Sequence, residues 1–263
     1  MFSIAAITFK NVFKDRIAII ILSMIAIYFL VPVFSSFSMR QVQEVSITAS
    51  LTINSFILLF LSIFGAMATI WRDIERKFVY TILSYPIKRS SYIIGRFLGF
   101  ALVMLVVLLV DLLLSAVAIH ICAGMYKSRL PIMWNNIIFA SIFSYLEYLL
   151  LMAFGFLFAS FSTSFFVPFF ATISVFIAGN ASQGVYDYIF HTGSHHYSLM
   201  FKTVIKAVYY ILPNFSSFDL TAYATYALKL EFDHMVYTSI YFILYFAVVM
   251  SLTNIIFKRR DLV

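Results

Sequence analysis

Six stretches of about twenty apolar residues limit what this chain can fold into more than any other feature. They cover 17–37, 51–70, 97–123, 134–160, 165–185 and 235–257. A helix needs about 20 apolar residues to cross a hydrocarbon core of about 30 Å. Within lipid, only helices and closed barrels satisfy every backbone N–H and C=O group. The sequence therefore predicts an all-α polytopic membrane protein with six transmembrane helices, organised as one transmembrane domain over 1–263.

Composition agrees with this prediction. Of the 263 residues, 63% are hydrophobic and 11% are charged, with a mean hydropathy of +0.99. A soluble domain of this size could not bury so much apolar surface. The first stretch is too long for a signal-peptide core and no small-residue cleavage site follows it, so we expect it to be retained. The single cysteine, Cys122, excludes an internal disulfide.

The net charge of +7 reports topology rather than a nucleic-acid partner. With both termini placed in the cytoplasm, twelve of the eighteen Lys and Arg residues lie inside. The six that lie outside are Arg40, Lys127, Arg129, Lys202, Lys206 and Lys229. Such an excess of basic residues on the cytoplasmic side is the positive-inside rule. We therefore expect both termini in the cytoplasm and no nucleic-acid binding.

The first sixteen residues predict an amphipathic helix before the first span. Phe2, Ala5, Phe9 and Val12 fall on one helical face, and Lys10 lies away from it. Such a helix can lie in the cytoplasmic interface. Two interpretations stay open: an elbow helix that helps to form a docking site, and a surface anchor with no protein partner.

A charged connector of 71–92 separates the second and third predicted spans. Its sequence predicts a short helix from Asp73 to Tyr85, with apolar residues such as Ile74, Phe78 and Ile82 on one face. Pro86 cannot continue that helix. From the residues alone, this segment is either another interfacial helix or a docking surface under the membrane.

The residues around this connector resemble a known signature. Glu75, Tyr85, Pro86, Arg89, Gly95, Phe97 and Gly99 match the pattern that follows the second span of ABC-2-type permeases, with Arg96 in place of the usual Lys. The segment 212–215, Leu-Pro-Asn-Phe, and the tail 259–262, Arg-Arg-Asp-Leu, are also similar to this family. The likeness is closest to the subgroup associated with nitrous oxide reductase maturation.

This resemblance implies a permease subunit in a bacterial cytoplasmic (inner) membrane. In the family, the connector contains a coupling helix that sits in a groove of a separate cytoplasmic ATPase subunit. The residues expected to couple to it are Asp73, Glu75, Phe78, Ile82, Tyr85, Pro86 and Arg89. ATP and Mg would then bind to the partner and no cofactor to this chain, and none of the eight glycines is followed by Lys, as a Walker A loop requires.

The family resemblance also sets the expected assembly and activity. Two copies, or this chain and a related permease, would form a dimer around the pathway. ATP hydrolysis would drive either export of a substrate or a conformational signal across the membrane. The segment 187–234, expected to carry short helices on the outer side, would be the gate or the surface for a periplasmic partner.

Two acids fall within predicted spans. Asp111 lies near the middle of the third span and Glu147 near the middle of the fourth. A carboxylate at the bilayer centre costs about 2.5–3.5 kcal/mol on insertion scales, so each should face protein or water. They either line a substrate or proton route, or form hydrogen bonds in a packed interface. Gly95 and Gly99 are four residues apart and are interpreted as a site of close helix packing.

Three histidines cluster in the predicted outer segment. His191, His195 and His196 could place two imidazoles on one helical face for a metal ion, but Gly193 lies between them and no Cys accompanies them. A solvated loop is the competing interpretation, and we expect no metal site.

Two other classes of function remain. An intramembrane enzyme, such as a lipid transferase or protease, needs clustered acids or a His-Glu-x-x-His array within a span. This sequence offers only Asp111 and Glu147, on different helices. A structural or signalling subunit would show no dependence on ATP hydrolysis.

Overall fold

The computed structural model describes residues 2–12, 18–38, 40–65, 89–126, 128, 130–162, 164–192 and 197–259. All regular elements in this part of the chain are helical. In chain order they are α1 (Phe2–Val12), α2 (Ala18–Ser36), α3 (Val42–Phe60), the π-helical turn η2 (Leu61–Gly65), α6 (Arg89–Met125), α7 (Trp134–Phe161), α8 (Phe166–Asp187), the π-helical turn η3 (Tyr188–Thr192), α9 (Leu199–Ile211), the 3₁₀ turn η4 (Phe215–Phe218), α10 (Thr221–Thr225) and α11 (Phe232–Arg259).

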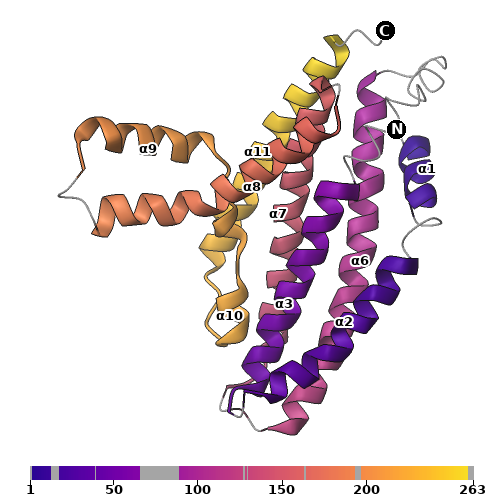
Figure 1. The fold of residues 1–263 in the computed structure, drawn as a ribbon, viewed down its shortest axis with the longest axis vertical. Coiled ribbons are helices and arrows are strands. Elements are labelled where there is room, and N and C mark those ends of the chain that lie inside the picture. Colours follow the sequence, from indigo (N-terminus) through magenta and orange to yellow (C-terminus); the bar gives the residue numbers. More distant parts are fainter. Residues whose placement is uncertain are drawn as a thin grey trace.

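The long helices form a bundle. In Figure 1, α3, α6 and α7 run along the long axis, α2 leans against them, and both termini lie at one end. We call this the terminal end. The α2–α3 and α6–α7 connections lie at the opposite end, which we call the far end (Figure 1). Contacts of α6 with α1, α2, α3, α7 and α11 hold the bundle together.

Five helical segments are long and apolar enough to cross a membrane. They are Val42–Phe64, Arg89–Met125, Trp134–Phe161, Phe166–Phe190 and Phe232–Arg259. The described part of the chain is therefore all-helical and contains several helices that could span a membrane, as a multi-pass membrane protein requires. The first predicted span, 17–37, coincides with α2, in which Ser23–Ser36 is a shorter apolar helix, so the count of six stays a prediction.

Two spans extend beyond the stretches predicted from hydropathy. α3 begins at Val42 rather than at 51 because Gln43, Ser46 and Ser50 point into the bundle, where protein covers them. α6 has 37 residues, about 55 Å at 1.5 Å per residue, against a hydrocarbon core of about 30 Å. It therefore projects beyond the lipid core.

The N-terminal helix α1 packs along the first turns of α6. Its buried face consists of Ile4, Ala5 and Thr8. A Cβ at Gly99 would lie 2.6 Å from the Thr8 Cβ and 2.8 Å from the Ala5 carbonyl oxygen, closer than real Cβ contacts come. The missing side chain at Gly99 therefore permits this approach of α1 and α6, as small residues do where helices pack in membranes.

The helices α8 and α9 form a hairpin that projects sideways from the bundle (Figure 1). At its foot, Gly179 of α8 lies against the chain after α9, and a Cβ there would overlap the Pro213 carbonyl oxygen and the Phe215 ring. Beyond the foot, Phe215 and Phe218 are fully buried in the core of the bundle. The predicted short helices in 187–234 thus exist as α9 and α10.

We predict that Gly99→Ala lowers the free energy of unfolding by about 1–3 kcal/mol, because the new methyl group forces α1 away from α6. Reversible denaturation in mixed detergent micelles measures this change. Gly124→Ala is the matched control: it lies near the end of the same helix, and a Cβ there meets nothing within 4 Å. Equal stability of the two variants would contradict the α1–α6 contact.

Candidate functional site

The coupling residues predicted from the connector fall at the edge of the described structure. Asp73, Glu75, Phe78, Ile82, Tyr85 and Pro86 lie outside the described residues. Arg89 is the first residue of α6, and its Nη1 donates a hydrogen bond to the Lys258 carbonyl oxygen at 3.2 Å. The end of the connector is therefore joined to the end of α11.

A second contact joins α1 to the same region. The Arg96 side chain is buried, and its Nη1 donates to the Thr8 Oγ1 at 3.1 Å. Its guanidinium lies 5.7 Å from the centre of the Tyr92 ring, within cation–π range. Tyr92 in turn stacks on Phe257 of α11, with ring centroids 5.9 Å apart. The first two turns of α6 thus hold both α1 and α11 beside the point where the connector enters.

A row of polar residues faces inward along α3. We call Gln43, Ser46, Ser50 and Asn54 the polar seam; all four are buried, at spacings of three and four residues. Gln43 Nε2 donates to the Leu130 carbonyl oxygen at 3.0 Å, and Ser46 Oγ donates to the Gln43 carbonyl oxygen at 2.7 Å. Polar residues on one helical face in a membrane bundle commonly join neighbouring helices.

Asp111 meets the polar seam through Tyr28. The Tyr28 hydroxyl donates to Asp111 Oδ1 at 2.8 Å. The Tyr28 hydroxyl oxygen also lies 3.2 Å from the Ser50 carbonyl oxygen. This tyrosine therefore links α2, α3 and α6. Asp111 is only 2% exposed, so its carboxyl group sits inside the protein, as its position in a membrane span requires.

Asn54 is the least satisfied member of the polar seam. Its side chain is 1% exposed, and neither its Oδ1 nor its Nδ2 has a hydrogen-bond partner among the described protein atoms. An amide buried without partners costs about 1–3 kcal/mol. Polar groups left in this state inside a protein call for an explanation, and function is one.

Glu147 has different neighbours from Asp111. It is buried on α7, and Asp219, just after η4, interacts with it electrostatically. The side chain of the adjacent Tyr148 lies near that of Ser55 of α3, one residue beyond Asn54. The two predicted acids thus face different parts of the bundle: Asp111 toward α2 and α3, and Glu147 toward the segment after η4.

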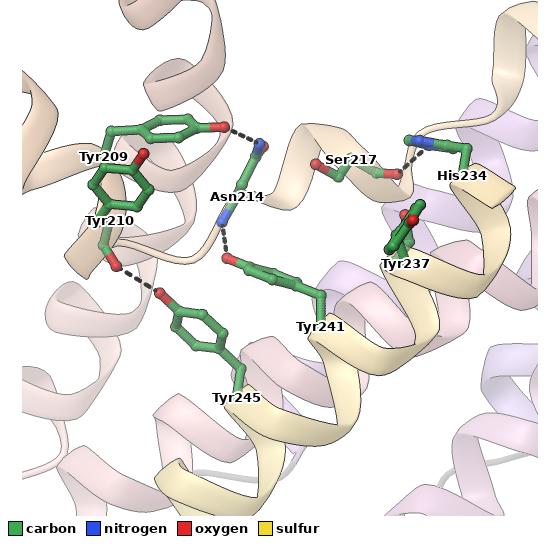
Figure 2. A pocket seen from close by; sticks show the side chains of 9 residues that line it. Tyr209, Tyr210, Asn214, Ser217, His234, Tyr237, Tyr241 and Tyr245 are labelled. Carbon is green, nitrogen blue, oxygen red and sulfur yellow. Dashed lines mark hydrogen bonds between the residues drawn. The ribbon is translucent and has the colours of Figure 1, made fainter.

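A cavity of about 420 Å³ lies between the foot of the hairpin and α11. Figure 2 shows its walls, which we call the tyrosine pocket. Its lining residues are Tyr209, Tyr210, Asn214, Ser217, His234, Tyr237, Thr238, Tyr241 and Tyr245. None of them is Lys, Arg, Asp or Glu, so the walls offer aromatic rings with hydroxyl, amide and imidazole groups but no carboxylate, ammonium or guanidinium group.

Most polar groups of the tyrosine pocket are used to hold the hairpin. Asn214 N–H donates to the Tyr241 hydroxyl at 2.8 Å, and the Tyr245 hydroxyl donates to the Tyr210 carbonyl oxygen at 3.1 Å (Figure 2). On the hairpin side, Gln183 Oε1 accepts from both Tyr209 and Asn214, at 2.8 and 2.7 Å. The pocket is therefore a hydrogen-bonded joint between α8, α9 and α11.

The side chains of the predicted histidine cluster fall outside the described structure. His195 and His196 lie outside the described residues, as does the side chain of His191. Among the residues that were described, no three His, Cys, Asp or Glu side chains are grouped to hold a metal ion. His234 instead lies 3.2 Å from the Ser217 carbonyl oxygen, through its Nε2.

Sequence reasoning found both acids but not the residues around them. The polar seam has a signal in the sequence, because positions 43, 46, 50 and 54 repeat with helical spacing. The seam could not be recognised from hydropathy because the apolar stretch begins at 51, after three of its four residues. In the tyrosine pocket, Tyr237, Tyr241 and Tyr245 repeat every four residues along α11, but the sequence does not show that α9 lies opposite them.

We predict that Tyr28 and Asp111 are energetically coupled. In a double-mutant cycle of Tyr28→Phe and Asp111→Asn, the coupling free energy should be about 0.6–1.7 kcal/mol, the range found for hydrogen bonds between membrane helices. Unfolding in mixed micelles measures it. Tyr237→Phe with Asp111→Asn is the control cycle, because Tyr237 is exposed, and it should give no coupling. Zero coupling in the first cycle would refute the bond.

We predict that Asn54→Leu raises the free energy of unfolding by about 1 kcal/mol, because it removes a buried amide that has no partner. Ser46→Ala is the matched control, since it removes a satisfied polar group from the same seam, and it should be neutral or destabilising. A clear loss of stability in Asn54→Leu would show that the amide has a partner in the folded protein.

Comparison with known proteins gives this chain no family. No protein-family model matches it, and no curated protein matches its sequence. The function is therefore inferred from the residues and contacts described above.

Proposed function

We propose that this chain is the membrane-spanning permease subunit of an ATP-binding-cassette transporter of the ABC-2 type. Separate cytoplasmic ATPase subunits would bind ATP and Mg and push on the connector. The proposal rests on the connector residues in the sequence and on a multi-pass helical fold. On this proposal the chain lies in the bacterial cytoplasmic membrane as six spans, with both termini in the cytoplasm.

The observation that carries the proposal is the convergence of three helices where the connector joins α6. Arg89 is the arginine of the Tyr-Pro-x-x-Arg run at 85–89, which belongs to the family-like pattern. Its side chain bonds to the end of α11. About two to three turns further on, Arg96 and Gly99 hold α1. A displacement of the connector would therefore move α1, α6 and α11 together rather than one helix alone.

The buried contacts of α6 supply a route for that motion into the membrane. α6 is one unbroken helix from Arg89 to Met125, so a tilt at its first turn is carried along its length. Asp111, near its middle, is tied by the Tyr28 hydroxyl to α2, and the same hydroxyl contacts the Ser50 carbonyl oxygen of α3. Rigid-body tilting of packed helices of this kind is a common form of switching.

A dimer would complete the transport pathway. Many large apolar side chains on α2, α6 and α11 are exposed, among them Phe29, Leu113 and Ile243, and these faces meet either lipid or a second permease chain. We propose that a homodimer, or a heterodimer with a related permease, either exports a substrate or transmits ATP-driven motion to a periplasmic partner. No catalytic role is assigned to this chain.

We predict that the chain, purified gently from its own host, brings an ATP-hydrolysing subunit with it. Replacing Glu75 and Tyr85 together by alanine should weaken that association by about tenfold or more, because two side chains at the centre of a docking surface would be lost. Pull-down of the ATPase and its rate of ATP hydrolysis in reconstituted vesicles measure the effect.

Arg259→Ala is the control, because it removes a charge from the same end of the bundle at an exposed position of α11. It should leave both association and ATP hydrolysis unchanged. If no nucleotide-binding subunit accompanies the wild-type chain, or if the Glu75→Ala/Tyr85→Ala variant couples as well as wild type, the transporter proposal is wrong.

A further inference from the structure

We infer that the α8–α9 hairpin lies in the membrane interface at the terminal end of the bundle, where α9 binds anionic lipid headgroups. The sequence placed 187–234 as a whole on the opposite side. The inference concerns the hairpin, 180–211. It states only that the hairpin lies on the same side of the membrane as the terminal end, without saying which side is the cytoplasm. It therefore stands or falls separately from the proposed transporter function.

The depth of the hairpin follows from counting along two helices that share a reference level. Arg89 of α6 and Lys258 of α11 are hydrogen-bonded, so they lie at one level. Gly99, which contacts α1, is ten residues or about 15 Å along α6 from that level. Tyr245, which bonds the hairpin at Tyr210, is thirteen residues or about 20 Å along α11. The foot of the hairpin and α1 therefore lie at nearly the same depth.

The far end of the bundle is much more distant from this level. Met125, the last residue of α6, lies 36 residues or about 54 Å from Arg89. The foot of the hairpin is thus on the terminal side of the midpoint of α6. Figure 1 shows the same relation, with α1 and the hairpin at similar heights on opposite sides of the bundle.

The direction of the hairpin fits an interface. In Figure 1, α9 and the later part of α8 run across the bundle axis, so the hairpin lies roughly parallel to the membrane plane. α9 exposes Phe201, Val204, Val208 and Ile211, which share one helical face, and Lys206 lies exposed away from that face. An amphipathic helix with a basic polar face is the usual form of an element that lies on a membrane surface.

Charge identifies the lipid that this surface fits. The segment 197–211 contains Lys202 and Lys206 and has no Asp or Glu. Basic segments beside a membrane are attracted to anionic headgroups. Moving these two lysines to the terminal side also changes the division of Lys and Arg from twelve and six to fourteen and four, which strengthens the positive-inside asymmetry.

The tyrosine pocket marks the same level. Tyr209, Tyr210, Tyr241 and Tyr245 gather at the foot of the hairpin, and Tyr186 stacks on Tyr209 with ring centroids 4.4 Å apart. Tyrosine is enriched where a membrane protein passes from hydrocarbon to headgroups, because its ring is apolar and its hydroxyl is polar. The pocket is therefore explained as part of an interfacial aromatic band.

The chain still reaches the far end after the hairpin. Asn136, two residues after the start of α7 at the far end, donates through Nδ2 to the Tyr223 and Leu228 carbonyl oxygens at 2.9 Å. Between the hairpin and these residues lies the short turn η4, whose Phe215 and Phe218 are buried. Non-helical chain flanks this turn at 212–214 and 219–220. Such backbone is tolerated at membrane depth where protein covers it. The fifth membrane crossing therefore has two parts, the first half of α8 and the chain from 212 to 225. The hairpin lies between these two parts.

Single-cysteine labelling tests this placement. Cys122 is buried and is the only cysteine, so Cys122→Ala gives a cysteine-free protein into which Lys206→Cys is introduced. If Cys122→Ala fails to fold, the same experiment is done with Cys122 retained. Lys258→Cys is the reference for the terminal end and Tyr126→Cys the reference for the far end. A membrane-impermeant maleimide is added to right-side-out and to inside-out vesicles.

We predict that Lys206→Cys is labelled in the same vesicles as Lys258→Cys, at least tenfold more than in vesicles of the opposite orientation. Labelling together with Tyr126→Cys would overturn the inference. Labelling from neither side would also overturn it, because the helix would then lie within the hydrocarbon core.

A second experiment tests the lipid partner. An environment-sensitive fluorophore on Thr203→Cys reports the surroundings of α9 in nanodiscs of phosphatidylcholine with increasing phosphatidylglycerol. We predict that phosphatidylglycerol shifts its emission, and that Lys202→Gln/Lys206→Gln raises the amount of phosphatidylglycerol needed by about fivefold per lysine. Lys229→Gln, outside the hairpin, is the control and should change nothing. A response that is identical in all three proteins would refute headgroup binding by α9.

Discussion

The structure depends on α6 as a continuous helix that other helices can approach closely. In lipid, apolar side chains gain little by meeting one another, so helices associate through close packing and a few buried polar contacts. Gly99 provides the close packing for α1, and Arg96 and Asp111 provide polar contacts at two depths. α2, α3 and α11 also contact α6, α8 packs against α7, and α9 packs against α8.

Polar contacts divide this bundle into regions of different character. At the terminal end, Arg89 and Arg96 join helices through bonds to a carbonyl oxygen and a hydroxyl group. In the middle, Tyr28 satisfies Asp111, while Asn54 keeps a buried amide without a partner among the described atoms. The end beside the connector is thus firmly joined, and the centre keeps an unsatisfied polar group. If the chain acts as proposed, motion would enter at the joined end and reach the centre along α6.

The helical, multi-pass architecture could be predicted from the sequence because lipid leaves few alternatives. Apolar length alone located α6, α7, α8 and α11 to within several residues. The start of α3 could not be located in this way, since Gln43, Ser46 and Ser50 are polar and are covered by protein rather than by water. Hydropathy measures composition and carries no information on which neighbour covers a side chain.

The candidate site was predictable only in part for a related reason. Asp111 and Glu147 stand out in the sequence because charge is rare in a span, but their neighbours lie far away along the chain. Tyr28 is 83 residues from Asp111, and Tyr241 is 27 residues from Asn214. Short helices within 187–234 could be predicted, but their depth could not, because the place of the hairpin is set by contacts with α11, such as that of Tyr245.

The docking of α1 on α6 has a consequence for biosynthesis. Residues 4–8 find their partner only when residues 96–99 have been made and inserted, so α1 is synthesised long before its binding surface exists. During that interval, an amphipathic helix of this kind can lie on the bilayer surface. Gly99 is therefore needed for assembly as well as for packing, because α1 can dock only after the first turns of α6 have been made and inserted.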